Sequence, residues 1–143
     1  MIYLAGPMFS QAELAFNRRL ADTLEAAGAR VFLPQRDGCS LAKLLEEMTP
    51  QEASRKIFAL DTEMVQRAAA FLIILDGRVP DEGACVALGF AGAKGVPCYG
   101  LATDPRTAKD GAFNPMIAGS IQRVFRTVEE AVDFFRRFQG AQT

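Results

Sequence analysis

The sequence predicts an α/β fold, one domain over residues 1–143 built on a doubly wound parallel sheet of five strands. Short apolar runs alternate along the chain with segments whose apolar residues recur at helical spacing. The run 68–75, AAAFLIIL, is apolar at every position, as expected of a strand buried on both faces. A chain of 143 residues is long enough to bury the core of one such domain.

Five apolar segments are expected to form the strands. They lie at residues 2–5, 30–33, 68–75, 97–101 and 121–125. Gly6 and Pro7 end the first segment, and Pro34 ends the second and leads into a polar loop at 35–38. Right-handed crossovers between five parallel strands favour the spatial order 2-1-3-4-5, which is the flavodoxin-like order.

Several predicted helices begin at residues that can accept a hydrogen bond from a free backbone N–H group. Ser10 lies three residues before Glu13, which is the spacing of a capping box. Thr49 and Glu52 have the same spacing, and Pro50 stands at the first helical position between them. We expect helices at residues 11–27, 41–48, 50–67, 83–94 and 128–138, and a short one after Asn114.

The composition limits the partners that the chain can have. Its net charge of −1 favours neither nucleic acid nor an anionic membrane surface. No apolar run approaches the ~20 residues of a membrane span. The strand pattern begins at residue 2, which leaves no room for a signal peptide, so we expect a cytoplasmic protein.

The composition also limits the chemistry. The chain has no histidine, so acid–base catalysis would depend on carboxylates, tyrosine, cysteine or lysine. The three cysteines, Cys39, Cys85 and Cys98, show no CxxC spacing. They fit reduced thiols in the interior better than a disulfide or a zinc site.

The segment 76–91, DGRVPDEGACVALGFA, is the first candidate for a ligand site. It follows the middle strand with a loop at 76–82 and then starts a helix. In open parallel sheets, ligands bind at the carboxyl ends of the strands, where fresh helix N-termini present unpaired N–H groups. In the predicted strand order, Tyr3, residues 6–9, the 76–82 loop and the start of a loop at 102–114 would line one crevice.

Asp61 is the second candidate. It lies on the margin of the apolar stripe of the 50–67 helix, one position after Leu60 and one turn after Ile57. A carboxylate there is unusual, because charged side chains are rarely buried without a partner. Spacing alone leaves two interpretations open: a partly solvated surface aspartate, or a carboxylate with a role in the crevice.

Several motifs together resemble the nucleoside 2-deoxyribosyltransferase family. They are YLAGPMFS at 3–10, the helix that carries Asp61, PDEG at 80–83, LGFA at 88–91 and NPM at 114–116. They cover nearly the whole chain in the family's order. The resemblance implies transfer of a 2-deoxyribosyl group between nucleobases through a covalent carboxylate–sugar intermediate, without metal or cofactor.

One position departs from the family pattern. The family nucleophile is the glutamate of Asp-x-Gly-x-x-x-Glu-x-Gly-x-Ala, a motif that runs here from Asp81 to Ala91 with Ala87 in place of the glutamate. A methyl group cannot attack the anomeric carbon, and losing a nucleophile costs orders of magnitude in rate. Glu82 is not expected to replace it, because five helical residues turn it about 140° away from position 87.

Three explanations for Ala87 stay open. The chain is an engineered Glu→Ala variant that traps an intact substrate, a natural relative that binds nucleosides without converting them, or an enzyme that uses another carboxylate. The intact motif around Ala87 favours the first, since decay of function would not preserve it. On the first two explanations the chain is inactive.

The resemblance implies roles for the other motif residues. Asp61 would exchange a proton with the nucleobase, and burial would raise its pKa as a general acid requires. Tyr3 would orient the nucleophile. Asp81 would hold the sugar 5′-hydroxyl together with Asn114. The remaining substrate-binding residues would be Gly6, Pro7, Met8, Phe9, Gly83 and Met116.

The implied partners are a deoxynucleoside, a free nucleobase and further copies of the chain. The resemblance implies that Asn114 completes the site of a neighbouring subunit, and we therefore expect a homo-oligomer of two or more subunits. Gln35, Arg36 and Asp37 follow the second strand and are placed to read the edges of the base.

Two other functions stay open. A hydrolase of the same superfamily would cleave the N-glycosidic bond of nucleoside 5′-monophosphates and would need donors for a phosphate. The first loop has no arginine, only Pro7, Met8 and Phe9, and Asp81 near the 5′ position would repel a phosphate. We therefore favour transfer. A non-catalytic nucleoside-binding protein is the second alternative.

Overall fold

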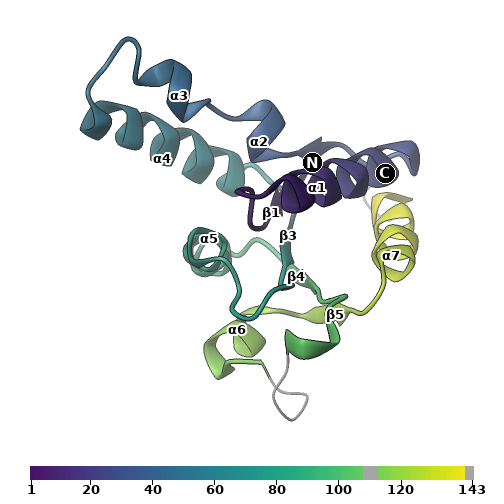
Figure 1. Ribbon diagram of the computed structural model, residues 1–143. Coiled ribbons are helices and arrows are strands. Elements are labelled where there is room, and N and C mark those ends of the chain that lie inside the picture. The colour runs from purple at the N-terminus through teal and green to yellow at the C-terminus, as the bar shows by residue number, and fades with distance from the viewer. Residues whose placement is uncertain (108–112, 141–143) are drawn as a thin grey trace.

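The computed structural model describes residues 1–107 and 113–140 of the chain (Figure 1). Its elements follow in the order β1 (Ile2–Ala5), α1 (Gln11–Ala26), β2 (Val31–Phe32), α2 (Pro34–Asp37), α3 (Leu41–Leu44), α4 (Pro50–Gln66), β3 (Ala70–Ile74), α5 (Glu82–Ala93), β4 (Cys98–Leu101), the 3₁₀ turn η1 (Pro105–Thr107), α6 (Pro115–Ser120), β5 (Arg123–Phe125) and α7 (Val128–Gly140).

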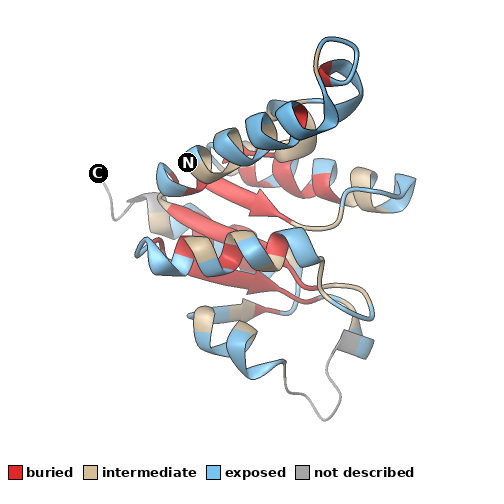
Figure 2. Cartoon of the chain, turned by 90° about the vertical axis from the view of Figure 1, so that its left-hand side faces the viewer, coloured by how far each residue is buried: buried red, intermediate tan, exposed pale blue. Residues whose placement is uncertain are grey.

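The strands form one parallel sheet in the order β2-β1-β3-β4-β5, which confirms the predicted α/β fold and strand order. Helices α1 and α7 cover one face, and α4, α5 and α6 lie on the other (Figure 1). Because both faces are covered, every residue of β3 is buried, and the strands β1 to β4 are red in Figure 2.

Alternate residues of β1 serve the two faces of the sheet. Ile2 and Leu4 pack in the core under α1 and α7, whereas Tyr3 and Ala5 pack in the core under α4 and α5. The Tyr3 ring is stacked on Phe32, with centroids 5.3 Å apart, and on the opposite neighbour Phe71 at 5.5 Å. The strand therefore turns its single tyrosine toward α4.

The predicted helix starts are present as capping interactions. Ser10 with Glu13, and Thr49 with Glu52, form complete capping boxes at α1 and α4. Side-chain oxygens also cap the helices that follow the middle and fourth strands. The residues that supply them are Asp81 for α5 and Asn114 for α6.

The prediction of a polar loop at 35–38 was wrong, because most of this segment forms the single helical turn α2. Pro34 occupies the first helical position, where its missing N–H costs nothing. The Asp37 carboxylate then accepts a hydrogen bond from the backbone N–H of Leu33 at 2.8 Å, which closes the turn. The strand before it is shorter than predicted, at Val31–Phe32.

The loops after β3 and β4 are joined by the carboxylate of Asp76. Its Oδ1 accepts hydrogen bonds from the backbone N–H groups of Thr103 (2.6 Å) and Asp104 (2.8 Å), and its Oδ2 accepts one from the Thr103 hydroxyl. The start of the predicted 102–114 loop is thus held at the end of β3. Residues 108–112 of that loop lie outside the described residues.

Within residues 1–107 and 113–140, we find no helix with the length and apolar character needed to cross a bilayer.

Candidate functional site

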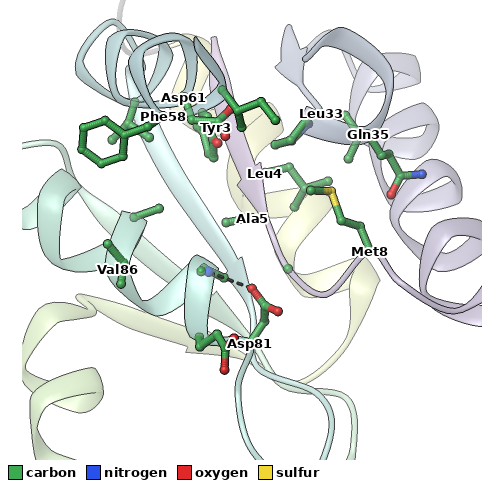
Figure 3. A pocket seen from close by; sticks show the side chains of 18 of the residues that line it. Tyr3, Leu4, Ala5, Met8, Leu33, Gln35, Phe58, Asp61, Asp81 and Val86 are labelled. Atoms are coloured by element: carbon green, nitrogen blue, oxygen red, sulfur yellow. Dashed lines mark hydrogen bonds between the residues drawn. The ribbon is translucent and has the colours of Figure 1, made fainter. Parts of the chain in front are cut away.

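A cavity of about 620 Å³ opens at the carboxyl ends of β1 and β2, between α4 and the first half of α5 (Figure 3). Its lining comes from β1 and the loop after it, one residue of α1, the corner between β2 and α2, the start of α3, and the two flanking helices. The volume is that of a small-molecule site, and its place at the switch point of the sheet is where such sites occur.

Most residues singled out from the sequence meet in this cavity. Those that line it are Tyr3, Gly6, Met8, Phe9, Asp61, Asp81, Gly83 and Ala87. Pro7 does not line it, and neither do Asn114 and Met116, which are exposed at the start of α6. The start of the 102–114 loop was predicted to border the crevice, but it does not line the cavity. A hydrogen bond holds Thr103 to Asp76, which does not line the cavity either.

Tyr3 and Asp61 lie side by side on one wall of the cavity (Figure 3). The Tyr3 hydroxyl lies close enough to the Asp61 carboxyl for each to affect the pKa of the other. Burial raises the pKa of Asp61, and the neighbouring Tyr3 hydroxyl partly opposes this shift. Burial and the neighbouring Asp61 charge also raise the pKa of Tyr3. Tyr3 therefore stays a hydrogen-bond donor, and Asp61 holds a proton more readily than an exposed aspartate.

Asp81 lies away from this pair at the N-terminus of α5 (Figure 3). Its Oδ2 accepts a hydrogen bond from the backbone N–H of Ala84 at 2.8 Å, which caps the helix. Its Oδ1 forms no hydrogen bond with any residue that the structure describes. One carboxylate oxygen thus supports the helix, and the other is available to a ligand.

Ala87 lies on the side of α5 that faces the cavity. It is half-buried and borders the same space as Tyr3 and Asp61. Glu82 also borders the cavity, although we expected it to turn away. The reason is that α5 begins at the cavity mouth, so its exposed first turn reaches the rim whatever its rotation relative to Ala87.

Gln35 lines the cavity as predicted, but Arg36 and Asp37 do not. The Arg36 guanidinium donates hydrogen bonds of 2.8 and 3.0 Å to the Glu25 carboxylate and two more, of 2.8 and 2.9 Å, to the Asp37 carboxylate. The hydrogen bond from Arg36 holds the pKa of Asp37 below its usual value. These two side chains stabilise the α2 turn, so neither can read a ligand.

Sequence reasoning missed Asn17, whose side chain is buried and borders the cavity. Its Nδ2 donates to the Pro7 carbonyl at 2.8 Å and to Gln35 Oε1 at 2.9 Å. The signal was present in the pattern of α1, because Asn17 takes the first place in the buried series that continues with Leu20, Ala21 and Leu24. A polar residue in such a series needs a partner inside the protein.

The charges that line the cavity have one sign. Asp61, Asp81 and Glu82 contribute carboxylates, and no lysine or arginine is among the described lining residues. The rim is apolar, with the side chains of Phe9 and Phe58 81% and 63% exposed. Such a site favours an uncharged ligand with a flat ring over an anion.

An α/β fold with a small-molecule cavity at the switch point of a parallel sheet defines a broad class of ligand-binding proteins and enzymes. Comparison with family models identifies one family within this class: the model described as nucleoside 2-deoxyribosyltransferase matches residues 2–133. The chain belongs to the nucleoside 2-deoxyribosyltransferase family. No significant match is found among curated protein sequences.

Solved structures of similar fold include a conserved protein from Enterococcus faecalis V583, with a TM-score of 0.77, 27% identity and coverage of 95% of this chain and 96% of that one. A 2-deoxyribosyltransferase from Bacillus psychrosaccharolyticus has a TM-score of 0.76 at 23% identity, covering 92% and 90%. The CMP N-glycosidase BcmB from Clostridium botulinum has a TM-score of 0.58 at 17% identity, covering 96% and 98%. Family and fold together indicate an enzyme class that transfers or hydrolyses glycosyl groups and acts on nucleosides and nucleobases.

Proposed function

We propose that the cavity binds a 2′-deoxynucleoside and that the fold is that of a 2-deoxyribosyltransferase whose nucleophile is missing in this chain. The observation that carries the proposal is the position of Ala87. It occupies the glutamate position of the family motif and borders the same cavity as Asp61 and Tyr3. A carboxylate at position 87 would share one space with a proton donor and a hydrogen-bonding tyrosine.

With glutamate at position 87, the reaction would proceed in two displacements. The carboxylate attacks C1′ as the C1′–N bond breaks, and the departing base takes a proton from Asp61. A second base then attacks C1′ through nitrogen, the C1′–O bond breaks, and the incoming base returns its proton to Asp61. The raised pKa of Asp61 supports this role, because a general acid must hold its proton near neutral pH.

We propose that Asp81 binds the 5′-hydroxyl through Oδ1, the oxygen that the helix cap leaves available. Asn114 would assist from a neighbouring subunit. Its exposure outside the cavity and the 80% exposure of Met116 beside it support a role between subunits rather than within one. The protein is then a homo-oligomer in which α6 of one copy reaches the cavity of the next.

Hydrolysis of a nucleoside 5′-monophosphate is the alternative, and a similar fold occurs in an enzyme named for that activity on CMP. The cavity disfavours it here. A phosphate near Asp81 and Glu82 would meet two carboxylates, and no cationic side chain is among the described lining residues to offset them.

The test is the Ala87→Glu variant, incubated with a deoxynucleoside and a second free base, with products separated by chromatography. We expect the new deoxynucleoside to form at least 10³-fold faster than with the unaltered chain. Ala87→Gln, which has the same shape without a nucleophile, is the control and should remain inactive. Free deoxyribose as the main product, or ribose phosphate in a parallel incubation with a nucleoside 5′-monophosphate, would indicate a hydrolase. No turnover by Ala87→Glu, with binding retained, would indicate a nucleoside-binding protein.

A further inference from the structure

We infer that Asn17 and Gln35 form a fixed amide pair that reads the hydrogen-bonding edge of the nucleobase, with the Asn17 carbonyl oxygen accepting from a base amino group. The inference rests on the proposed function, because it takes the ligand of the cavity to be a nucleoside. Both residues line the cavity, and Gln35 is drawn across it from Phe58 in Figure 3.

Two backbone carbonyls determine which way both amides point. Pro7 O lies 2.8 Å from Asn17 Nδ2, and Leu14 O lies 2.9 Å from Gln35 Nε2. A carbonyl oxygen can only accept, so each amide must turn its NH₂ group toward it. The second N–H of Asn17 then donates to Gln35 Oε1 at 2.9 Å. Reversing either amide would bring two oxygens together, so the orientation of the pair is unique.

This arrangement leaves one acceptor and one donor unused. Asn17 Oδ1 forms no hydrogen bond with the described residues, although only 3% of the residue is exposed. Since none of the described side-chain polar atoms is both fully buried and unpaired, Oδ1 must reach the space of the cavity that Asn17 lines. Gln35 Nε2 donates one N–H to the carbonyl oxygen of Leu14, and its other N–H is not used by the described residues.

The unused acceptor, Asn17 Oδ1, and the unused donor, the second N–H of Gln35 Nε2, together complement the hydrogen-bonding edge of a nucleobase. A base with an amino group beside a ring nitrogen offers a donor and an acceptor next to each other, and side-chain amides recognise adenine in this way. Met8 and Leu33 lie near Gln35 in Figure 3 and provide apolar contact for the faces of such a ring. Asp61 lies apart from the pair on α4 and keeps its separate task of proton exchange.

The ligand itself offers the first test, with the unaltered chain, which the proposed function expects to bind nucleosides without converting them. Calorimetry would compare 2′-deoxyadenosine with purine 2′-deoxyriboside, which lacks the amino group and has no other donor on its base. We expect purine 2′-deoxyriboside to bind about ten-fold more weakly, the effect of one buried hydrogen bond. Equal affinities would overturn the inference.

The second test assigns the effect to Asn17. In Asn17→Ala both ligands should bind more weakly, because the loop at Pro7 loses its hydrogen bond. The ratio of the two affinities should also fall from about ten to about one, since the acceptor is gone. A purely structural role would weaken both ligands equally and preserve the ratio, which would contradict the inference. Phe58→Ala, a change on the rim without a hydrogen bond, is the control that should keep the ratio.

The two proposals fail differently. If the unaltered chain binds neither ligand, the proposed function is wrong and the inference falls with it. If it binds both equally well, the proposed function stands and the role of Asn17 alone is refuted. If Asn17→Ala does not fold, the comparison of ligands on the unaltered chain can still refute the inference through equal affinities, and Asn17→Ser, a milder change, takes its place in the second test.

Discussion

On the proposed function, position 87 separates binding from chemistry in this cavity. The methyl group of Ala87 would take the place of the nucleophile, while the surrounding groups remain, including the neighbouring Tyr3 and Asp61 and the helix cap at Asp81. Turnover by the unaltered chain would therefore assign the chemistry to another carboxylate of the cavity. Turnover only after Ala87→Glu would show that the rest of the site is competent.

Asp61→Asn is expected to change how stability depends on pH. Burial raises the pKa of Asp61 in the folded chain, so the folded state binds this proton more tightly than the unfolded state. The stabilisation is fully present below the unfolded pKa of about 4 and is lost as pH rises through the folded pKa. Asparagine does not titrate. Relative to the unaltered chain, the variant should thus gain free energy of unfolding as the pH rises from 4 to 8.

Urea unfolding followed by circular dichroism at the two pH values measures this change. Thr62→Ala is the matched control, because it alters the same cavity wall without a titrating group. Its effect on the free energy of unfolding should be the same at both pH values. A pH-independent effect of Asp61→Asn would mean that burial does not perturb this carboxyl.

At the scale of elements, the N-terminus of α5 combines support and recognition in one residue. Asp81→Ala should lower the free energy of unfolding by about 1 kcal/mol through loss of the cap and should also weaken nucleoside binding. Asp81→Asn should recover the stability, since asparagine caps equally well. Chemical unfolding and calorimetry on each variant measure the two effects.

Thr49→Ala provides the comparison for Asp81, because Thr49 caps α4 and does not line the cavity. It should cost a similar amount of stability and leave nucleoside affinity unchanged. If Asp81→Ala also left affinity unchanged, Asp81 would be a helix cap and nothing more.

At the scale of the whole molecule, the open question is whether one chain makes a complete site. Asn114 lies outside the cavity of its own chain, so a site that needs it requires a second copy. In the Ala87→Glu background, Asp61→Asn and Asn114→Ala chains should each be nearly inactive alone. After mixing with subunit exchange, about a quarter of the sites in a dimer should combine two intact halves.

The rate of base exchange before and after mixing measures this complementation. Mixing two batches of the same variant is the control and should restore nothing. A mixture no more active than its components would place Asn114 in its own subunit's site or outside catalysis.

Much of the fold and part of the site followed from local patterns. The run at 68–75 predicted the central strand, and capping residues marked the starts of α1 and α4. The predicted strand order placed Tyr3 at the crevice, and helical spacing together with the family resemblance singled out Asp61; the fold brings the two side by side. The α2 turn was missed because Asp37 stabilises it by a hydrogen bond back to Leu33, an interaction that composition does not reveal.

The sequence by itself determined the strand order, the helices other than α2 and the residue types available for chemistry, because periodicity and caps act over a few residues and the crossover rule leaves few topologies. Only the tertiary structure decided which side chains share the cavity. In the folded chain, Asn17 and Gln35 are hydrogen-bonded although they are 18 positions apart. Arg36 is paired with Glu25, and Asp76 binds Thr103 at the start of the 102–114 loop, which therefore does not border the cavity. Those outcomes depend on distances between segments remote in the chain, and no local pattern encodes them.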